Sequence, residues 1–327
     1  MNIFAYRLPG ESHSTIVEAG SSLSTLPPSD GREYFLLHPF LPQEGLRAYP
    51  VNRKIDAIPS ETIRENAGQH HFKEMTRRQY EKYVEEIIRQ INMEYVWKVV
   101  ASRRKAVDIT MDPQSIFDAL CGAYPNAFVF LISTPEFGNW VGASPELLLE
   151  RQGNKLASMA LAGTRPRGSR GEWDPKNAKE QEVVTYFIKK ELFMNGFPYH
   201  VSPPATLEAG PVEHIMTYIT AEITPDSHLD NLLRRISPTP ALAGYPSETA
   251  TDIIMLHEGN SRQLYGGYLG PWNANGDFRL NVVLRCARLW PDKAILFAGG
   301  GITKYSDPNE EWLETERKLS TLQFVIK

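Results

Sequence analysis

Four glutamates crowd into the stretch NEEWLETERK at 309–318, directly after a glycine run at 299–301. An Asp-Pro pair just ahead of it fits the N-cap and first position of a helix, whose dipole tolerates acidic residues, so a solvated helix start explains part of the crowding. On such a helix three charged residues fall on one line, at i, i+3 and i+7: Glu311, Glu314 and Lys318. Carboxylates beside glycines that permit close backbone approach predict a site for a hard cation and an anionic ligand.

A second acidic contribution is expected elsewhere in the chain, because Mg²⁺ is held by one or two carboxylates together with water and an anionic substrate. Glu180 is one candidate, with Glu182 as its neighbour. Both stand in KNAKEQE at 176–182, at the start of an apolar helical pattern. The alternative interpretation of both is a charged first turn of a helix.

Two further positions have the chemistry of proton transfer. Lys98 stands alone inside the apolar run VWKVV, and if both faces of that strand are covered, desolvation favours the neutral amine that acts as a general base. The alternative is an alternating strand whose lysine points to solvent. Glu146, in GASPELLL at 142–149, lies at the lip of an apolar strand, where a carboxyl group can stay protonated and act as an acid.

Three other positions have side chains or backbone groups that can bind an anion. The turn LAGTRPRG at 161–168 combines Gly163 and Thr164 with two arginines, which can hold a carboxylate through backbone N–H groups and guanidinium forks. Arg285 is embedded in the apolar run LNVVLRC, and a buried arginine normally needs an anion. His214, in VEHIMT, is as consistent with a core histidine as with a ligand-binding one.

These residues need a scaffold in which helices alternate with groups of short strands. A capping box of Thr76 and Gln79 opens one helix, and further helices are expected near 113–121, over 176–193 and from Asp307. Strands are predicted over 95–102, 127–133, 147–150, 155–162, 265–272, 278–290 and 294–300, with tight turns at Gly153-Asn154 and Asn275-Gly276. Strands joined by tight turns pair in antiparallel fashion, so the sequence predicts an α+β fold of largely antiparallel sheets layered with outer helices.

Composition narrows the class of protein. The 327 residues include 42% apolar residues and carry a net charge of only −4, so we expect a folded globular protein, and the absence of a basic block argues against a nucleic-acid partner. Cys121 and Cys286 lie far apart in apolar contexts and are interpreted as reduced core thiols. No window reaches the ~18 apolar residues of a membrane span. No membrane attachment and a cytoplasmic location are therefore expected.

Taken together, the segments resemble the chorismate-utilising enzymes: isochorismate synthases, salicylate synthases and the chorismate-binding subunits of anthranilate and aminodeoxychorismate synthases. The resemblance rests on ten stretches in register: KVVASR (98–103), GASPELLL (142–149), LAGTRPRG (161–168), KNAKEQ (176–181), VEHIMT (212–217), SPTPALAGYP (237–246), YGGYLG (265–270), FRLNVVLRCA (278–287), AGGGI (298–302) and EEWLETERK (310–318). It implies the chorismate-binding fold of anthranilate synthase component I over residues 71–327, behind a reduced, loop-rich amino-terminal lead-in at 1–70. It also implies a monomer.

The resemblance implies a role for each candidate residue. Glu180 and Glu314 would be the Mg²⁺ ligands, with Glu182 as the fallback for Glu180, and Glu311 would hold metal-bound water. Lys98 matches the base that activates water, and Glu146 the acid that protonates the departing C4 hydroxyl. The implied substrate-binding positions are Gly163, Thr164, His214, Ala241, Leu242, Tyr265, Arg285, Gly300, Gly301 and Lys318.

Two positions, those of Lys98 and Ala162, separate the water-using members from the ammonia-using ones. The ammonia-using members usually carry glutamine at the Lys98 position, and the aminodeoxychorismate type carries lysine where Ala162 stands, so this chain resembles the water-using members. Ala241 and Leu242 resemble the synthase that stops at isochorismate. The implied reaction is the Mg²⁺-dependent conversion of chorismate to isochorismate, for menaquinone or a catechol siderophore, with menaquinone preferred.

Two alternatives stay open. A salicylate synthase would share the first step and then eliminate pyruvate. A chorismate-binding protein without catalysis is suggested by Gln181 and Ser237, which stand where family members usually carry histidine, and by the reduced amino-terminal region.

Overall fold

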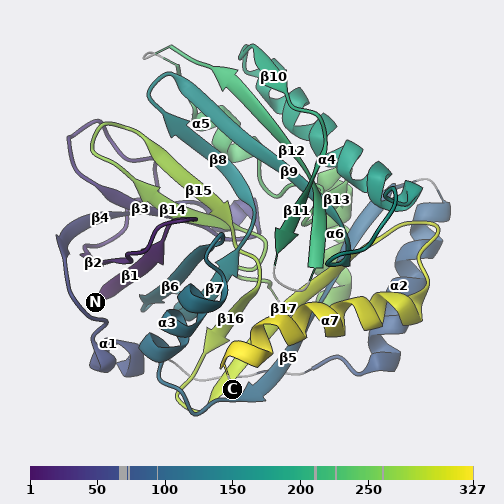
Figure 1. Cartoon of the computed structure of the whole chain (residues 1–327), viewed down its shortest axis with the longest axis horizontal. Coiled ribbons are helices and arrows are strands. Elements are labelled where there is room, and N and C mark those ends of the chain that lie inside the picture. Colours follow the sequence, from purple (N-terminus) through teal and green to yellow (C-terminus); the bar gives the residue numbers. More distant parts are fainter. Residues whose placement is uncertain are drawn as a thin grey trace.

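The computed structural model describes residues 1–65, 72, 74–93, 95–209, 212–224, 227–259 and 261–326. Its strands pair in antiparallel fashion and form two stacked sheets that share strand β4 (Figure 1). Sheet A contains, in spatial order, β4 (Arg47–Lys54), β2 (Thr15–Ala19), β1 (Asn2–Arg7), β6 (Phe128–Thr134), β7 (Gly138–Ser144), β16 (Cys286–Leu289), β17 (Lys293–Ile302), β5 (Lys98–Asp108) and β13 (Gly244–Tyr245).

Sheet B also starts at β4, which pairs with β3 in this sheet. It contains β3 (Tyr34–His38), β14 (Tyr268–Trp272), β15 (Phe278–Val282), β8 (Leu147–Gln152), β9 (Lys155–Pro166) and β12 (Val212–Glu222), with β10 (Tyr199–Val201) and β11 (Ala205–Ala209) both paired to β12.

Helices cover the outer faces of both sheets. They are α1 (Ser60–Glu65), α2 (Arg77–Asn92), α3 (Pro113–Ala123), α4 (Pro175–Met194), α5 (Asp230–Arg235), α6 (Ser247–Glu258) and α7 (Pro308–Ile326), with a short 3-10 turn at Pro42–Glu44. Helix α4 lies along β9 and β12 of sheet B, whereas α7 packs on β17 and β5 of sheet A beside α2 (Figure 1). Helix α6 packs on β5 and β13.

Apolar side chains fill each interface between these layers. Phe4 of β1 stacks on Phe35 of β3 between the two sheets, with ring centroids 4.4 Å apart. Val184 of α4 packs with the buried side chains of sheet B, and Leu319 of α7 with those of sheet A. Helix, sheet, sheet and helix thus follow one another, which confirms the predicted α+β class of antiparallel sheets layered with outer helices.

The structure confirms the predicted helix starts at Thr76 and Asp307 and the two predicted tight turns. Thr76 caps α2 as predicted, because its hydroxyl accepts from the Gln79 N–H and the Gln79 side chain accepts from the Thr76 N–H. Asp307 accepts from the Glu310 N–H at 3.0 Å at the start of α7. The turns at Gly153-Asn154 and Asn275-Gly276 join β8 to β9 and β14 to β15.

Two predictions about the strands are wrong. The single strand expected over 278–290 is broken between Val282 and Cys286, because the backbone at Arg285 adopts a positive φ of 45° and passes from sheet B to sheet A. Residues 1–65 are not loop-rich, since they contain β1 to β4, and these strands pair with both sheets. The domain boundary predicted after residue 70 lies outside the described residues.

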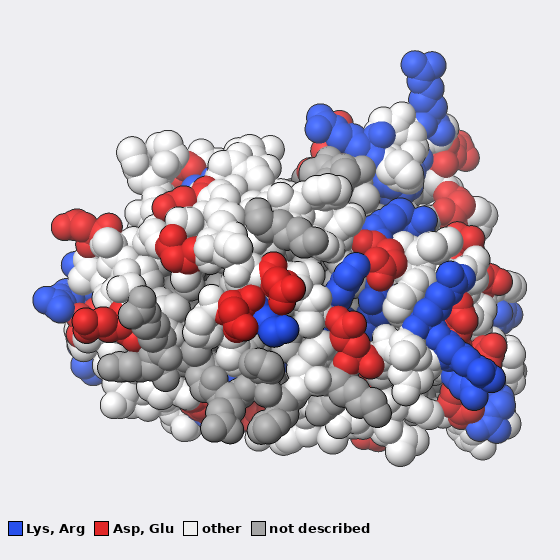
Figure 2. All heavy atoms as spheres, turned by 90° about the horizontal axis from the view of Figure 1, so that it is seen from below, with Lys and Arg blue, Asp and Glu red and all other residues white. Residues whose placement is uncertain are grey.

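Acidic and basic side chains are interspersed on the face that Figure 2 shows. No helix among the described residues is both long enough and apolar enough to cross a membrane.

Candidate active site

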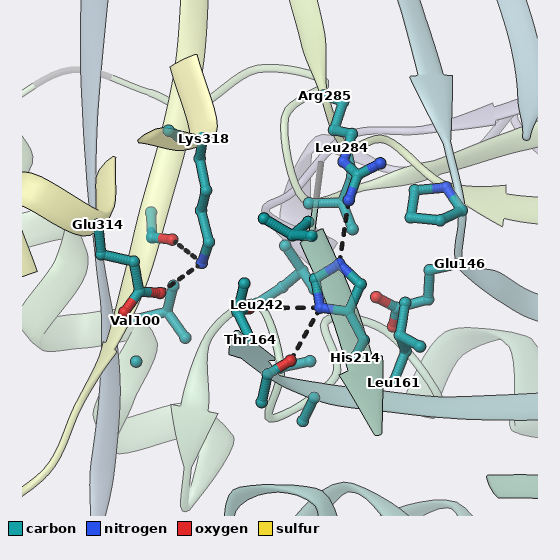
Figure 3. A pocket seen from close by; sticks show the side chains of 18 of the residues that line it. Val100, Glu146, Leu161, Thr164, His214, Leu242, Leu284, Arg285, Glu314 and Lys318 are labelled. Carbon is teal, nitrogen blue, oxygen red and sulfur yellow. Dashed lines mark hydrogen bonds and ion pairs between the residues drawn. The ribbon is translucent and has the colours of Figure 1, made fainter. Parts of the chain in front are cut away.

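A cavity of about 140 Å³ is lined by residues of both sheets, such as Val100 of β5 and Thr164 of β9, and by residues of the helices α4 and α7 (Figure 3). Thirteen of the fifteen predicted site residues line it: Lys98, Glu146, Gly163, Thr164, Glu180, His214, Ala241, Leu242, Tyr265, Arg285, Gly301, Glu314 and Lys318. Gly300 and Glu311 do not. Residues that are up to 220 positions apart in the chain, from Lys98 to Lys318, therefore face one space.

Glu146 and Arg285 enter the cavity from two places where the chain crosses between the sheets. Glu146 lies between β7 of sheet A and β8 of sheet B, and Arg285 lies between β15 of sheet B and β16 of sheet A. The two crossings are hydrogen bonded, because the Glu146 carbonyl accepts from the Val282 N–H and from the Asn281 side chain, both at 3.1 Å. The buried Asn281 was not predicted from the sequence, where it reads as one polar residue in an apolar run.

Glu146 has the environment of a protonated carboxyl group. The residue is 2% exposed, and burial raises the pKa of its carboxyl to about 8, against a smaller lowering by the charge of Lys98. Near neutral pH the carboxyl therefore carries a proton that it can donate. This agrees with the prediction that an acid stands at the lip of β8.

His214 is neutral, and its tautomer follows from its two neighbours. Its Nδ1 lies 2.8 Å from the Gly163 carbonyl, which can only accept, and its Nε2 lies 3.0 Å from the Arg285 guanidinium, which can only donate (Figure 3). The proton is thus on Nδ1. Burial and the charge of Arg285 lower the pKa of His214 to about 3, while burial lowers the pKa of Arg285 to about 10.

Lys98 points into the cavity from the edge of β5. It is 5% exposed, which excludes the alternative of a lysine that faces solvent. Its Nζ lies 3.8 Å from the Glu180 carboxylate of α4, and this separation is an ion pair without a short hydrogen bond. Gly301 permits the arrangement, because a Cβ at that position would lie 2.6 Å from Lys98 Cε.

The glycine run of β17 presents two different faces. Gly299 and Gly301 line the cavity, with the Tyr265 hydroxyl 3.0 Å from where a Cβ at Gly299 would stand. Gly300 points the other way, and a Cβ there would lie 2.7 Å from Glu311 Oε2. Alternation along a strand separates them, so the line of Glu311, Glu314 and Lys318 predicted on α7 is split: only the last two face the cavity.

Glu314 and Lys318 form the edge of the cavity nearest α7. Lys318 Nζ lies 2.8 Å from Glu314 Oε1 and donates to the Gly299 carbonyl at 2.8 Å (Figure 3). Arg103 of β5 holds this helix from the other side, donating to the Thr315 hydroxyl at 2.7 Å with its guanidinium 3.7 Å from the centre of the Trp312 ring.

The first turns of α4 are tied to sheet B. The Asn177 amide oxygen accepts from the Thr164 N–H at 3.1 Å, and its side chain packs on Gly163, whose φ is 72° and whose Cβ would clash with it at 2.9 Å. Buried Gln181 donates to the Thr217 hydroxyl of β12 at 2.6 Å. These contacts turn Glu180 into the cavity, whereas Glu182 is exposed and pairs with Lys179.

The carboxylates of the cavity fit a magnesium ion whose remaining coordination positions are filled by water and an anionic ligand. Among the described residues, no group of three or more His, Cys, Asp or Glu side chains could hold a metal by itself. Glu180 and Glu314, however, face one cavity from different helices, and Mg²⁺ needs only one or two carboxylates when water and an anionic substrate fill its other positions. Glu180 Oε1 stands 3.1 Å from where a Cβ at Gly301 would be, so the glycine leaves room beside this carboxylate.

Comparison with known proteins gives consistent matches. A family model described as chorismate binding enzyme matches residues 48–327. Isochorismate synthase EntC of Escherichia coli K12 is 34% identical over 244 residues, which are 70% of this chain and 62% of that protein. Putative isochorismate synthase MenF of Mycobacterium tuberculosis is 33% identical over 248 residues, 69% of this chain and 66% of that protein. The matched region thus spans just under two-thirds of these relatives.

Solved structures share the architecture. A putative 2,3-dihydroxybenzoate-specific isochorismate synthase, DhbC, from Bacillus anthracis aligns with a TM-score of 0.82 at 22% identity, over 98% of this chain and 95% of that one. The menaquinone-specific isochorismate synthase MenF of Escherichia coli aligns with a TM-score of 0.83 at 22% identity, over 100% of this chain and 89% of that one. At this level of identity the likeness is one of fold.

Proposed function

The chain belongs to the chorismate-binding enzyme family, and on that premise we propose that it is an isochorismate synthase, an isomerase that converts chorismate to isochorismate. The observation that carries the proposal is the pair of buried groups that face one cavity, the Lys98 amine and the Glu146 carboxyl. A base and an acid on a closed cavity are what the addition of water at one ring carbon and the loss of hydroxide at another require.

The proposed reaction balances between these two residues. Once its ammonium group has released a proton to solvent, Lys98 takes a proton from water as the oxygen bonds to C2 of the ring. The ring double bonds shift, and the C4–O bond breaks as Glu146 supplies the proton that makes the leaving group water. Lys98 then carries one proton more and Glu146 one fewer, and exchange with solvent restores both. Burial raises the pKa of Glu146 to about 8, so its carboxyl holds the required proton at neutral pH.

The remaining residues would orient the substrate. Arg285 and the Tyr265 hydroxyl are placed to bind a carboxylate, since both line the cavity and the Arg285 side chain is held by the neutral His214. Thr164 and Gly163 line the cavity beside His214. The Gly299 and Gly301 backbone replaces Gly300 as the part of the glycine run that faces the substrate.

Glu180 and Glu314 would hold Mg²⁺, with Lys318 beside Glu314. Glu311, for which the resemblance implies a role through metal-bound water, lies on the other face of Gly300 and does not line the cavity. When bound, the ion would neutralise the negative charge of the C1 carboxylate. The exposure of Glu182 and its pairing with Lys179 favour Glu180 as the ligand on α4.

The physiological role is proposed at a coarser level. Menaquinone synthesis is the preferred pathway, supported by relatives named isochorismate synthase MenF, with siderophore synthesis as the alternative. A monomer and a cytoplasmic location remain predictions, as does the absence of a nucleic-acid or membrane partner.

One incubation tests the proposal. The protein is mixed with chorismate and MgCl₂, and the products are separated by chromatography and identified by mass and by pyruvate assay. We expect isochorismate, at a rate that chelation by EDTA abolishes, without release of pyruvate. Pyruvate in equal amounts with consumed chorismate would identify a salicylate synthase, and Mg²⁺-dependent binding without conversion would identify a non-catalytic chorismate-binding protein.

A further inference from the structure

A buried ion pair outside the cavity connects two of its walls. Glu258, at the end of α6, and Arg262, which follows it, are 8% and 1% exposed. Arg262 Nε lies 2.8 Å from Glu258 Oε2, and Arg262 Nη2 lies 2.5 Å from Glu258 Oε1. Neither residue lines the cavity, and neither has a place in the proposed reaction.

Arg262 also donates hydrogen bonds to the backbone carbonyls of two residues that line the cavity. Arg262 Nη2 donates to the Val100 carbonyl at 2.6 Å, and Nη1 donates to the Leu242 carbonyl at 2.7 Å. Val100 is two residues beyond Lys98 on β5, and both Val100 and Leu242 line the cavity. The planar fork of one guanidinium therefore fixes the spacing between these two segments.

Glu258 binds the same strand two residues further on, at Ser102. Its Oε1 accepts from the Ser102 N–H and its Oε2 from the Ser102 hydroxyl, both at 2.9 Å. The Tyr83 hydroxyl of α2 adds a longer contact at 3.4 Å, and Phe40 covers the guanidinium, 4.5 Å from the ring centre. The pair is thus in contact with groups from several separate segments of the fold.

We propose that Glu258 and Arg262 are positioning residues for the reaction: together they hold the strand that carries Lys98 at a set distance from the Ala241–Leu242 wall. The inference rests on the proposed function, because it assigns the pair an effect on the step that Lys98 performs. Lys98 sits at the very start of β5, where its own pairing to β13 involves only Gly244 and Tyr245. Next to it the Val100 N–H donates to the Ala243 carbonyl at 2.8 Å, and β5 pairs with β17 from Val99 to Asp108, so the Arg262 fork adds a side-chain link between Val100 and Leu242 to these backbone contacts.

Burial of the pair guides the choice of variant. Removing either charge leaves the other charge buried without its partner, which destabilises the fold strongly. Arg262→Lys keeps the charge, but an ammonium cannot reach Glu258, Val100 and Leu242 in the planar geometry of the guanidinium. The matched control is Arg235→Lys, whose guanidinium also forms two hydrogen bonds to a buried carboxylate, that of Glu191, at 2.7 and 3.2 Å, without lining this cavity.

The experiment compares kcat, KM for chorismate and thermal unfolding of the unaltered protein and the two variants. We expect Arg262→Lys to lower kcat by about 10- to 100-fold, as displacement of a catalytic group does, with KM changed by less than about threefold and the protein folded at the assay temperature. Arg235→Lys should keep kcat within about twofold. A loss of kcat that matches the unfolded fraction, or an unchanged kcat in Arg262→Lys, would overturn the positioning role.

A second measurement does not depend on activity. Hydrogen exchange of the backbone amides at 98–102 and 241–243 should become faster in Arg262→Lys, and stay unchanged in Arg235→Lys, because the fork joins those two segments. Unchanged exchange in both segments would also overturn the inference. If the unaltered protein forms no isochorismate, the proposed function fails by itself, and the exchange result still decides whether the pair holds the two walls.

Discussion

The two ends of the cavity are built in different ways. At the His214 corner (Glu146, His214 and Arg285), a neutral imidazole is held between an obligate acceptor and an obligate donor, at 2.8 and 3.0 Å, and only one arrangement of protons satisfies both. At the lysine corner (Lys98, Glu180, Glu314 and Lys318), charges of alternating sign face the same space, and the Lys98–Glu180 separation is 3.8 Å.

The difference indicates a division of labour. The His214 corner is complete without a ligand, as recognition of a fixed substrate group requires. The lysine corner has charges that a cation and an anionic substrate would rearrange, because each carboxylate that turns to a metal releases its lysine. We therefore expect substitutions at the lysine corner to change the rate and the Mg²⁺ requirement. At the His214 corner, substitution of Arg285 should change affinity, whereas substitution of Glu146, the proton donor, should change the rate and its pH dependence.

The largest effect is expected from Lys98→Ala. Removal of the general base should lower kcat by about 10²- to 10⁴-fold while the fold is retained. Lys105→Ala is the matched control on the same strand, because Lys105 is partly exposed and pairs with Glu316 away from the cavity. Equal turnover in Lys98→Ala and Lys105→Ala, measured by isochorismate formation, would contradict the assigned role.

Glu146→Gln should lower kcat by about 10²-fold, since an amide cannot supply the proton. In the unaltered protein kcat/KM should fall as pH rises through about 8, where the Glu146 carboxyl ionises, and the variant should lose this limb of the profile.

Stability gives an independent check on the same group. The folded-state pKa of Glu146 lies above its ordinary value of 4.5, so the native protein binds more protons than the unfolded chain between these values. The free energy of unfolding should therefore decrease as pH rises from about 4.5 to 8. Glu146→Gln should remove this contribution and be more stable than the unaltered protein above pH 8, by urea denaturation. A less stable variant at that pH would count against a protonated Glu146.

Arg285→Lys should act mainly on affinity. Loss of the bidentate fork should raise KM for chorismate by about 10- to 100-fold, with a smaller effect on kcat. Arg288→Lys, on the adjacent strand, is the control, since Arg288 donates to Gln263 and does not line the cavity. If KM stayed normal in Arg285→Lys, the substrate carboxylate would have to be bound elsewhere.

The smallest effects should separate two neighbouring glutamates. Glu180→Gln should raise the Mg²⁺ concentration needed for half-maximal rate by about tenfold or more, because a carboxamide is a weaker ligand for Mg²⁺ than a carboxylate. Glu182→Gln should leave it unchanged, since that side chain is exposed and pairs with Lys179. A Mg²⁺ titration that shows the opposite order would move the ligand to Glu182.

Much of this site follows from the sequence because its signals are local or its motifs recur. Thr76, Asp307 and the Asn275-Gly276 turn act within a few residues, and the structure confirms each of them. Periodicity, by contrast, placed Glu311 beside Glu314 on α7 without showing that Gly300 turns to the opposite face from Gly301. That depends on the alternation of β17, which a helix pattern does not contain.

Other features depend on contacts between distant segments. The break at Arg285 cannot be read from an apolar run, because it arises where the chain leaves one sheet for the other. The Glu258–Arg262 pair has the ordinary appearance of a charged helix end, and only its burial against β5 reveals what it holds. Asn177 and Asn281 were missed as site residues for the same reason.

The two neighbouring crossings between the sheets have a mechanical consequence. The Glu146 carbonyl is bonded to Asn281 and Val282, a few residues before Arg285, so the crossings form one joint. If the two sheets move relative to each other, Glu146 and Arg285 should therefore move together. The distance between a carboxylate bound by Arg285 and the proton donor Glu146 is then preserved. Lys98, at the start of β5, takes no part in these hydrogen bonds. Thermal opening of the molecule would therefore lengthen the path from base to ring before it disturbed the path from acid to leaving group.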